Sequence, residues 1–342
     1  MLRIPTSAWL LILVGLATAC AGSDRPNATQ SGVEKEFQLE SWSQLQLCGF
    51  VVSTNAPEPQ VRRLLAKLCR FVDLLDAELD QREEHVTSHR RLFVFRDLAQ
   101  FQQLARQREL AHTRRSADHV TIGVPADLGA EGVPILFHEL VHLALYEHPS
   151  FAYPLWYHEG MAELLSTAMI RENLATLGNV PARHRATLER FEALPLGVLL
   201  GTWETLELEG GNVDRFYADS WAMVRFLHGR IGAGAPSHHA AMLRFVGLAS
   251  AGTPWRQAFD ASFKVPLEEF AQDFDRFRRE AASGVSHVWY AELPEQLPDI
   301  HLESLAASEA ALRLGAYANE VEALPLSRAF YDYARTLDPA IR

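Results

Sequence analysis

The segment 131–145 constrains the fold of this 342-residue chain more than any other. Its apolar residues recur at helical spacing, which is typical of a helix packed into a core; they are Val133, Leu136, Phe137, Leu140, Val141 and Ala144. The same segment carries His138, Glu139 and His142. Polar and ionisable side chains are costly to bury unless something compensates them. The segment therefore predicts a core helix whose polar residues hold a bound ion.

The spacing of these polar residues indicates which ion. His138 and His142 are four residues apart and lie on one face of a helix, so two imidazoles can bind one Zn²⁺. Glu139 projects to the adjacent side, where it can act as a general base toward a water molecule. A catalytic zinc ion needs three protein ligands and one open position. The chain must therefore supply a third ligand.

One candidate for the third ligand is His148. It lies six residues beyond His142, where the metzincin pattern places its last histidine. That pattern also has a glycine at the position of Leu145, because the chain turns sharply there, and a positive φ is costly for leucine. A loop histidine beside Pro149 is the alternative interpretation of His148.

The second candidate is Glu159. Trp156, Glu159, Gly160 and Ala162 match the W-L-x-E-G-x-A signature of gluzincins, with Tyr157 in place of the leucine. The chain resembles this family of zinc metallopeptidases, in the form found in bacterial envelope proteins. The resemblance implies that Glu159 is the third zinc ligand and that the protein hydrolyses peptide bonds.

Two further residues complete the expected site. Glu163 lies one helical turn after Glu159 and can accept the free ring N–H of a ligating histidine, which would fix its tautomer and orientation. Tyr217 is expected to open a further apolar helix and resembles the gluzincin tyrosine that donates a hydrogen bond to the oxyanion. A buried structural tyrosine is the alternative for Tyr217.

One part of the gluzincin pattern is missing. Exopeptidase members carry a G-x-M-E-N segment that holds the free amino terminus of the substrate, whereas residues 118–124 read D-H-V-T-I-G-V. Aminopeptidase activity therefore lacks support, although hydrolysis of peptide bonds by a metal-activated water remains the leading expectation. The alternative is an envelope interaction or assembly protein on a peptidase scaffold with non-catalytic zinc.

The amino terminus has the features of a targeting segment. Arg3 precedes an apolar run, residues 9–17, that is too short for a comfortable membrane span. Small residues then lead to Cys20, which resembles a bacterial lipobox. We expect an exported lipoprotein of the bacterial cell envelope, facing the periplasm and held to the membrane by a lipid on Cys20. Cleavage after Ala19 without lipidation is the alternative.

Cys48 and Cys69 are the remaining cysteines. An oxidising periplasm permits a disulfide between them, while two buried thiols would behave as small hydrophobic side chains. The sequence leaves both alternatives open.

The order of expected elements predicts an α+β fold. Strands at 50–53, 91–95 and 120–124 alternate with helices at 58–79 and 98–110, which indicates a small sheet packed by helices. From Pro154 onward the pattern is almost entirely helical. The strand before the histidine helix is expected to form the edge of a cleft between the two parts.

Composition and the chain ends set the remaining boundaries. The net charge of −11 argues against nucleic acid as a partner. The resemblance implies a peptide or protein substrate, and the expected lipid on Cys20 implies a membrane. Residues 301–342 are expected to form two helices, as a tetratricopeptide-like unit or a plain hairpin. The expected organisation is a signal peptide at 1–19, a tether at 20–36, a peptidase domain at 37–283 (α/β part 37–128, helical part 129–283) and a helical extension at 284–342.

Overall fold

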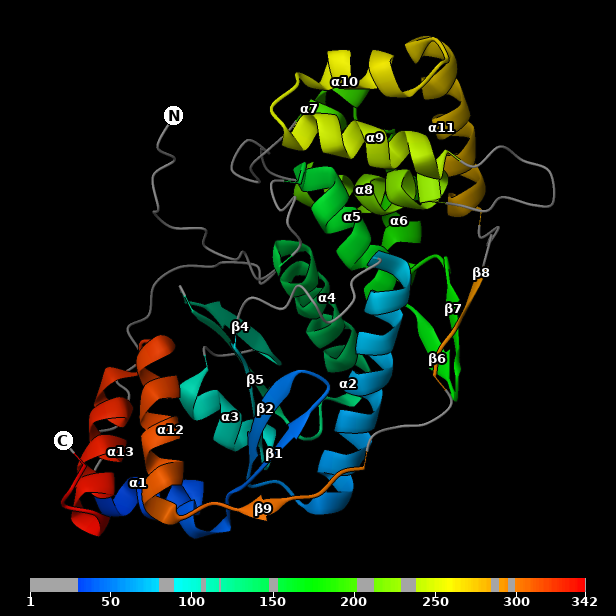
Figure 1. Ribbon diagram of the computed structural model, residues 1–342. Helices are drawn as coiled ribbons and strands as arrows, with labels where there is room; N and C mark the ends of the chain where they lie inside the picture. Colours follow the sequence, from blue (N-terminus) through cyan, green and yellow to red (C-terminus); the bar gives the residue numbers. More distant parts are fainter. Residues whose placement is uncertain are drawn as a thin grey trace.

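The computed structural model describes residues 30–79, 89–105, 109–116, 118–147, 153–201, 212–228, 238–283, 289–294 and 299–341. It confirms the predicted α+β fold, with a six-stranded sheet below and a mainly helical part above (Figure 1). Cys20, His148 and the whole expected signal peptide lie outside the described residues. Within them, no helix has both the length and the hydrophobicity needed to cross a membrane.

The large sheet has the strand order β4-β5-β3-β2-β1-β9. Its centre is the parallel set β2 (Phe50–Thr54), β3 (His89–Phe95) and β5 (His119–Pro125), which confirms the three predicted strands. The strands β1 (Ser43–Leu47), β4 (His112–Arg115) and β9 (Glu303–Ser304) pair antiparallel and were not predicted.

The strand before the histidine helix, β5, is an inner strand of the sheet. β5 is paired on both sides, with β3 and with β4, and β4 takes the edge position. β4 was not predicted, because its sequence, H-T-R-R, contains no apolar residue and so shows no strand periodicity.

Two long helices cover one face of this sheet. α2 (Glu58–Leu79) has the predicted bounds, and α4 (Gly129–Glu147) is the predicted histidine helix. They pack through stacked rings of Phe71 and Phe137, whose centroids lie 3.9 Å apart. The disulfide between Cys48 and Cys69 joins the β1–β2 turn to α2, which settles the choice that the sequence left open.

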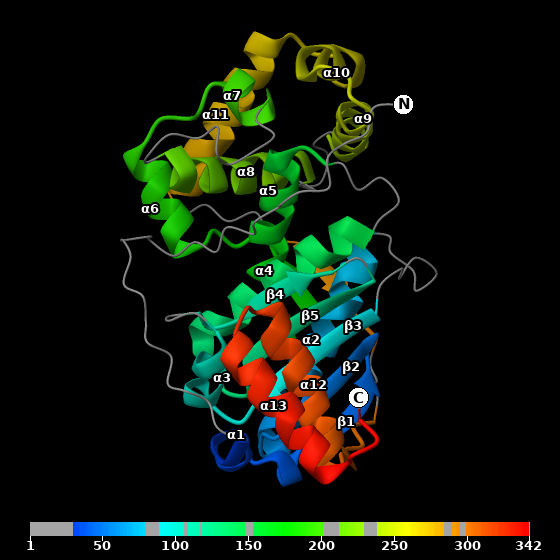
Figure 2. The ribbon, with the colours of Figure 1, turned by 90° about the vertical axis from the view of Figure 1, so that its left-hand side faces the viewer.

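The opposite face is covered by α12 (Ala307–Glu320), α13 (Leu324–Leu337), α3 (Leu98–Leu104) and the N-terminal α1 (Gln30–Phe37) (Figures 1 and 2). A short 3-10 helix, η1 (Leu39–Ser41), follows α1. The predicted C-terminal helix pair is confirmed, and it packs on the sheet through a cluster that includes Phe93, Phe95, Tyr317 and Phe330. α3 ends earlier than the predicted 98–110, because the chain must return at His112 to form β4.

The upper part holds seven helices among the described residues: α5 (Leu155–Ser166), α6 (Ala182–Arg190), α7 (Leu196–Gly201), α8 (Asn212–His228), α9 (His239–Ser250), α10 (Trp255–Ser262) and α11 (Leu267–Ala282). A three-stranded antiparallel sheet, β6 (Met169–Arg171), β7 (Leu174–Leu177) and β8 (Trp289–Glu292), corrects the expectation of an almost purely helical region. Strands of three or four residues are too short to show a clear period in the sequence. One continuous hydrophobic core runs from the large sheet through α4 and α5 into the upper helices.

Candidate metal centre

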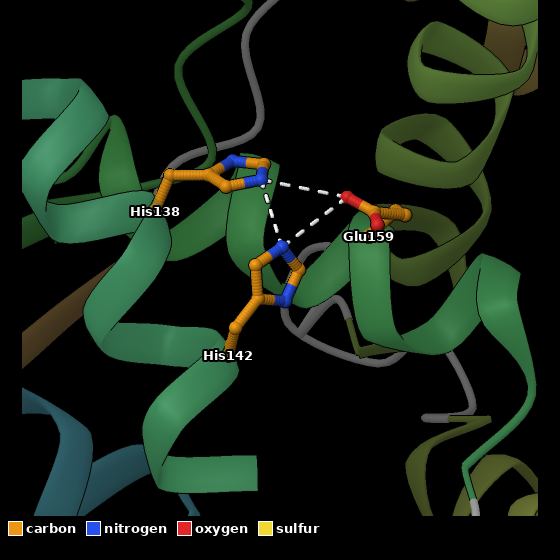
Figure 3. Close-up of side chains that lie close together, drawn as sticks. All are labelled: His138, His142 and Glu159. Atoms are coloured by element: carbon orange, nitrogen blue, oxygen red, sulfur yellow. Dashed lines mark hydrogen bonds and ion pairs between the residues drawn. The ribbon is translucent and has the colours of Figure 1, made fainter. Parts of the chain in front are cut away.

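The candidate centre lies where α4 meets α5. His138 and His142 project from successive turns of α4 toward α5 (Figure 3), and their Nε2 atoms are 2.9 Å apart. Phe137 projects from another side of α4 and stacks on Phe71 of α2, so the histidines are left to face the upper helices. The helical spacing in the sequence is what brings the two imidazoles together.

α5 supplies the third side chain. Glu159 Oε2 lies 3.4 Å from Nε2 of His138 and 3.4 Å from Nε2 of His142. Gly160 sets this position, because a Cβ there would meet the Ser220 carbonyl oxygen and lie 2.5 Å from Val224 Cγ2, both on α8. The glycine of the W-Y-H-E-G-M-A-E segment thus lets α5 approach α8 closely.

The three converging atoms have the separations that a metal site needs. Ligand atoms about 2.0–2.1 Å from a tetrahedral zinc ion lie about 3.3 Å from one another. Glu159 Oε2 is also buried without a hydrogen-bond partner among the described residues, an arrangement that costs free energy unless a cation compensates it. His138, His142 and Glu159 therefore form a group that can hold a metal ion.

The charges at this point favour a cation. Burial opposes the ionisation of Glu159, but His142 and His138 outweigh it and hold the pKa of this carboxyl well below its ordinary value. Burial likewise opposes charge on His138, yet Glu159, Glu163 and Glu139 together raise its pKa. The His138 side chain is 18% exposed and that of His142 only 6%, so the group opens to solvent on the His138 side.

Glu163 lies one turn along α5 and reaches the other nitrogen of His138. Its Oε1 is 3.5 Å from His138 Nδ1, while Oε2 is 2.8 Å from His184 Nε2 and pairs with Arg183. Burial opposes its ionisation, but His184, His138 and Arg183 lower the pKa of Glu163 to about 2. Arg183 and His184 lie at the start of α6, twenty residues from Glu163, and no sequence pattern links them to the centre.

Tyr217 lies in α8 and its side chain is buried. The expectation that it opens this helix is wrong, because α8 already includes Asn212 and Tyr217 falls in its second turn. Burial, together with the negative charges of Glu159, Glu163 and Glu139, raises its pKa far above the ordinary value. The phenol therefore stays protonated and keeps its hydrogen for donation.

Glu139 is half-buried on α4, beside His138. Its negative charge contributes to the raised pKa values of His138, Tyr217 and Tyr146. The charge of the carboxylate is therefore felt by residues around the two histidines.

Two aromatic neighbours of the centre were not predicted. The His158 ring stacks on His142, with centroids 4.4 Å apart and an interplanar angle of 11°. The ring of Tyr146 packs against the ring of His158, with centroids 4.6 Å apart. Burial lowers the pKa of His158 to about 3, so it serves as a neutral plate against the His142 ring. No sequence pattern indicates this contact, since it depends on how α4 and α5 pack against each other.

No protein-family model matches this chain. A comparison with curated proteins gave no match either. The resemblance to gluzincins therefore rests on the motif residues and on the geometry of the group they form.

Proposed function

We propose that this protein is a zinc-dependent peptidase of the gluzincin type, with His138, His142 and Glu159 as metal ligands. The observation that carries the proposal is the convergence of these three side chains, with Glu139 on the same helix as both histidines. Two imidazole nitrogens and one carboxylate oxygen are a donor set typical of catalytic zinc in peptidases.

The chemistry follows from the donor set and its neighbours. Bound zinc would polarise the scissile carbonyl and lower the pKa of water. Glu139 would accept the proton of the attacking water and deliver it to the leaving amine. Tyr217, kept protonated by its surroundings, would donate a hydrogen bond to the developing oxyanion.

Glu163 would act through His138. Its carboxylate lies beside His138 Nδ1, so a proton on that nitrogen leaves Nε2 free as a metal ligand. The contacts of Glu163 to His184 and Arg183 hold the carboxylate in place and ionised.

The sequence features of the amino terminus support an envelope location. A lipid on Cys20 would anchor the protein to a membrane, with the peptidase facing the periplasm and acting on a peptide or protein substrate.

The test combines metal analysis with a cleavage assay. Zinc-loaded protein is incubated with an unstructured protein and with a peptide library, beside a Glu139→Gln variant. We expect one zinc ion per chain in both proteins. The rate of cleavage should be lower in the variant by about a hundredfold or more. Stoichiometric zinc without cleavage by the wild type would favour the alternative, an interaction protein with non-catalytic zinc. The fragments also distinguish internal from terminal cleavage.

A further inference from the structure

One arginine near the candidate centre has no carboxylate partner among the described residues. Arg115 ends the edge strand β4 and is exposed, and its guanidinium lies 5.0 Å from the ring centroid of Tyr146 on α4. Arg183, which also lies near the centre, is paired with Glu163. Of these two cations, only Arg115 is left to bind an anionic group from outside.

The pleat of β4 directs Arg115 toward α4. Alternate residues of a strand point to opposite faces. His112 meets Tyr317 of α12 on one face, so Arg114 shares that face and Arg115 takes the other, which packs against α4 (Figures 1 and 2). Arg114 instead donates a hydrogen bond to the Thr113 carbonyl.

Ring contacts connect this position to a candidate metal ligand. The guanidinium of Arg115 lies over Tyr146, Tyr146 packs on His158 at 4.6 Å, and His158 stacks on His142 at 4.4 Å. Burial raises the pKa of Tyr146, Glu159 and Glu139 raise it further, and Arg115 opposes the rise, so the phenol lies in the field of both the centre and Arg115. An extended peptide advances about 3.3 Å per residue, so four residues span about 13 Å, close to the length of this series of contacts. A group held by Arg115 is therefore expected about four residues from the bond being cut.

We propose that Arg115 and Tyr146 form a carboxylate-recognition subsite, which selects substrates with an acidic group on the β4 side of the cleaved bond. A guanidinium binds a carboxylate through two parallel hydrogen bonds in its own plane, and an aromatic ring beneath it helps to hold that plane. The carboxylate can come from a glutamate or aspartate side chain, or from the C-terminus of the peptide. This inference rests on the proposed function and adds the substrate class to it.

The test measures binding separately from cleavage. Zinc-loaded Glu139→Gln protein is titrated with fluorescein-labelled peptides in which a single glutamate is moved over four positions on either side of the centre. Matched peptides carry glutamine or lysine there, and each is made with a free and with an amidated C-terminus. Glutamate at one position should strengthen binding about tenfold over glutamine, as expected for a hydrogen bond to a charged group. If only the free C-terminus gives this gain, the terminal carboxylate is the group recognised.

Substitutions assign the preference to Arg115. Arg115→Ala in the same background should remove the tenfold gain without changing zinc content or melting temperature, and Arg115→Lys should retain part of it. Arg114→Ala is the matched control and should keep the full preference. Three results would overturn the inference. They are equal affinity for acidic and neutral peptides, no measurable binding of any peptide, and an unchanged preference in Arg115→Ala.

The outcomes also separate this inference from the proposed function. Cleavage by the wild type without any Arg115-dependent preference would leave the peptidase proposal standing and reject the subsite. An Arg115-dependent preference in binding, without cleavage by the zinc-loaded wild type, would support the subsite and reject the peptidase proposal.

Discussion

Gly160 offers the sharpest test of how the fold positions the candidate centre. Its neighbour Glu159 supplies the carboxylate, and a Cβ at position 160 would meet the Ser220 carbonyl oxygen and Val224 of α8. A backbone carbonyl within a helix cannot move away alone, so Gly160→Ala would force α5 and α8 apart. The Glu159 carboxylate would then move relative to the two histidines of α4.

The size of the effect follows from two opposing contributions. Overpacking of a well-packed core costs about 1–3 kcal/mol, and contact with backbone favours the upper end of that range. Replacing a helical glycine with alanine gains about 1 kcal/mol in helix propensity. The net loss in the free energy of unfolding is therefore about 2 kcal/mol, which corresponds to a fall in Tm of roughly 3 °C for a chain of this length.

A second glycine provides the matched control. Gly247 lies in helix α9, is exposed, and has no atom within 4 Å of the position of an added Cβ. Gly247→Ala should therefore keep only the helix-propensity gain and raise the free energy of unfolding by up to about 1 kcal/mol. Thermal denaturation of the metal-free proteins measures both variants, and a zinc titration measures whether Gly160→Ala also weakens metal binding. Equal stability and zinc affinity in Gly160→Ala and wild type would refute the proposed close approach of α5 and α8.

The remaining predictions concern the ligands, the tyrosine and the anchor. His142→Ala should abolish stoichiometric zinc in metal analysis, whereas His148→Ala should leave it nearly unchanged; strong loss in the second variant would revive the metzincin alternative. Tyr217→Phe should lower turnover about a hundredfold or more, the cost of losing one oxyanion donor, with little change in zinc content, and unchanged kcat would return Tyr217 to a structural role. Cys20→Ser should move the protein from the membrane fraction to the soluble fraction and abolish palmitate labelling; a soluble, unlabelled wild type would indicate an ordinary secretory signal.

The parts of the fold that were predictable are those with a long or distinct period. The bounds of α2 and the strands β2, β3 and β5 follow from apolar periodicity over many residues or in buried runs. β4 and the three-stranded sheet were not predictable, because their short strands carry too few residues to define a period. β9 has only two residues and depends on the C-terminal segment returning to β1.

The candidate site divides in the same way. Helical spacing relates His138 to His142 and Glu159 to Glu163, each pair within its own segment. The convergence of the two segments was expected only from the resemblance to gluzincins. The partners of Glu163 and the His158 plate depend on how α5 and α6 pack, and spacing along one helix carries no information about that packing. Tyr217 could be proposed only by resemblance, and its depth within α8 differs from the expectation.

The candidate centre lies at the junction between two layers of the fold. α4 belongs to the large sheet through its contact with α2, and α5 belongs to the upper helices through Gly160 and α8. The histidines therefore come from one layer of the fold and the carboxylate from the other. A metal ion bound by all three would fasten the two layers together, and its binding free energy would add to the stability of that junction. Zinc should accordingly protect the α4–α5 contact more than the distant α12–α13 hairpin, and amide hydrogen exchange with and without zinc would measure the difference. Uniform protection across both regions would contradict the assignment of the metal to the junction between the layers.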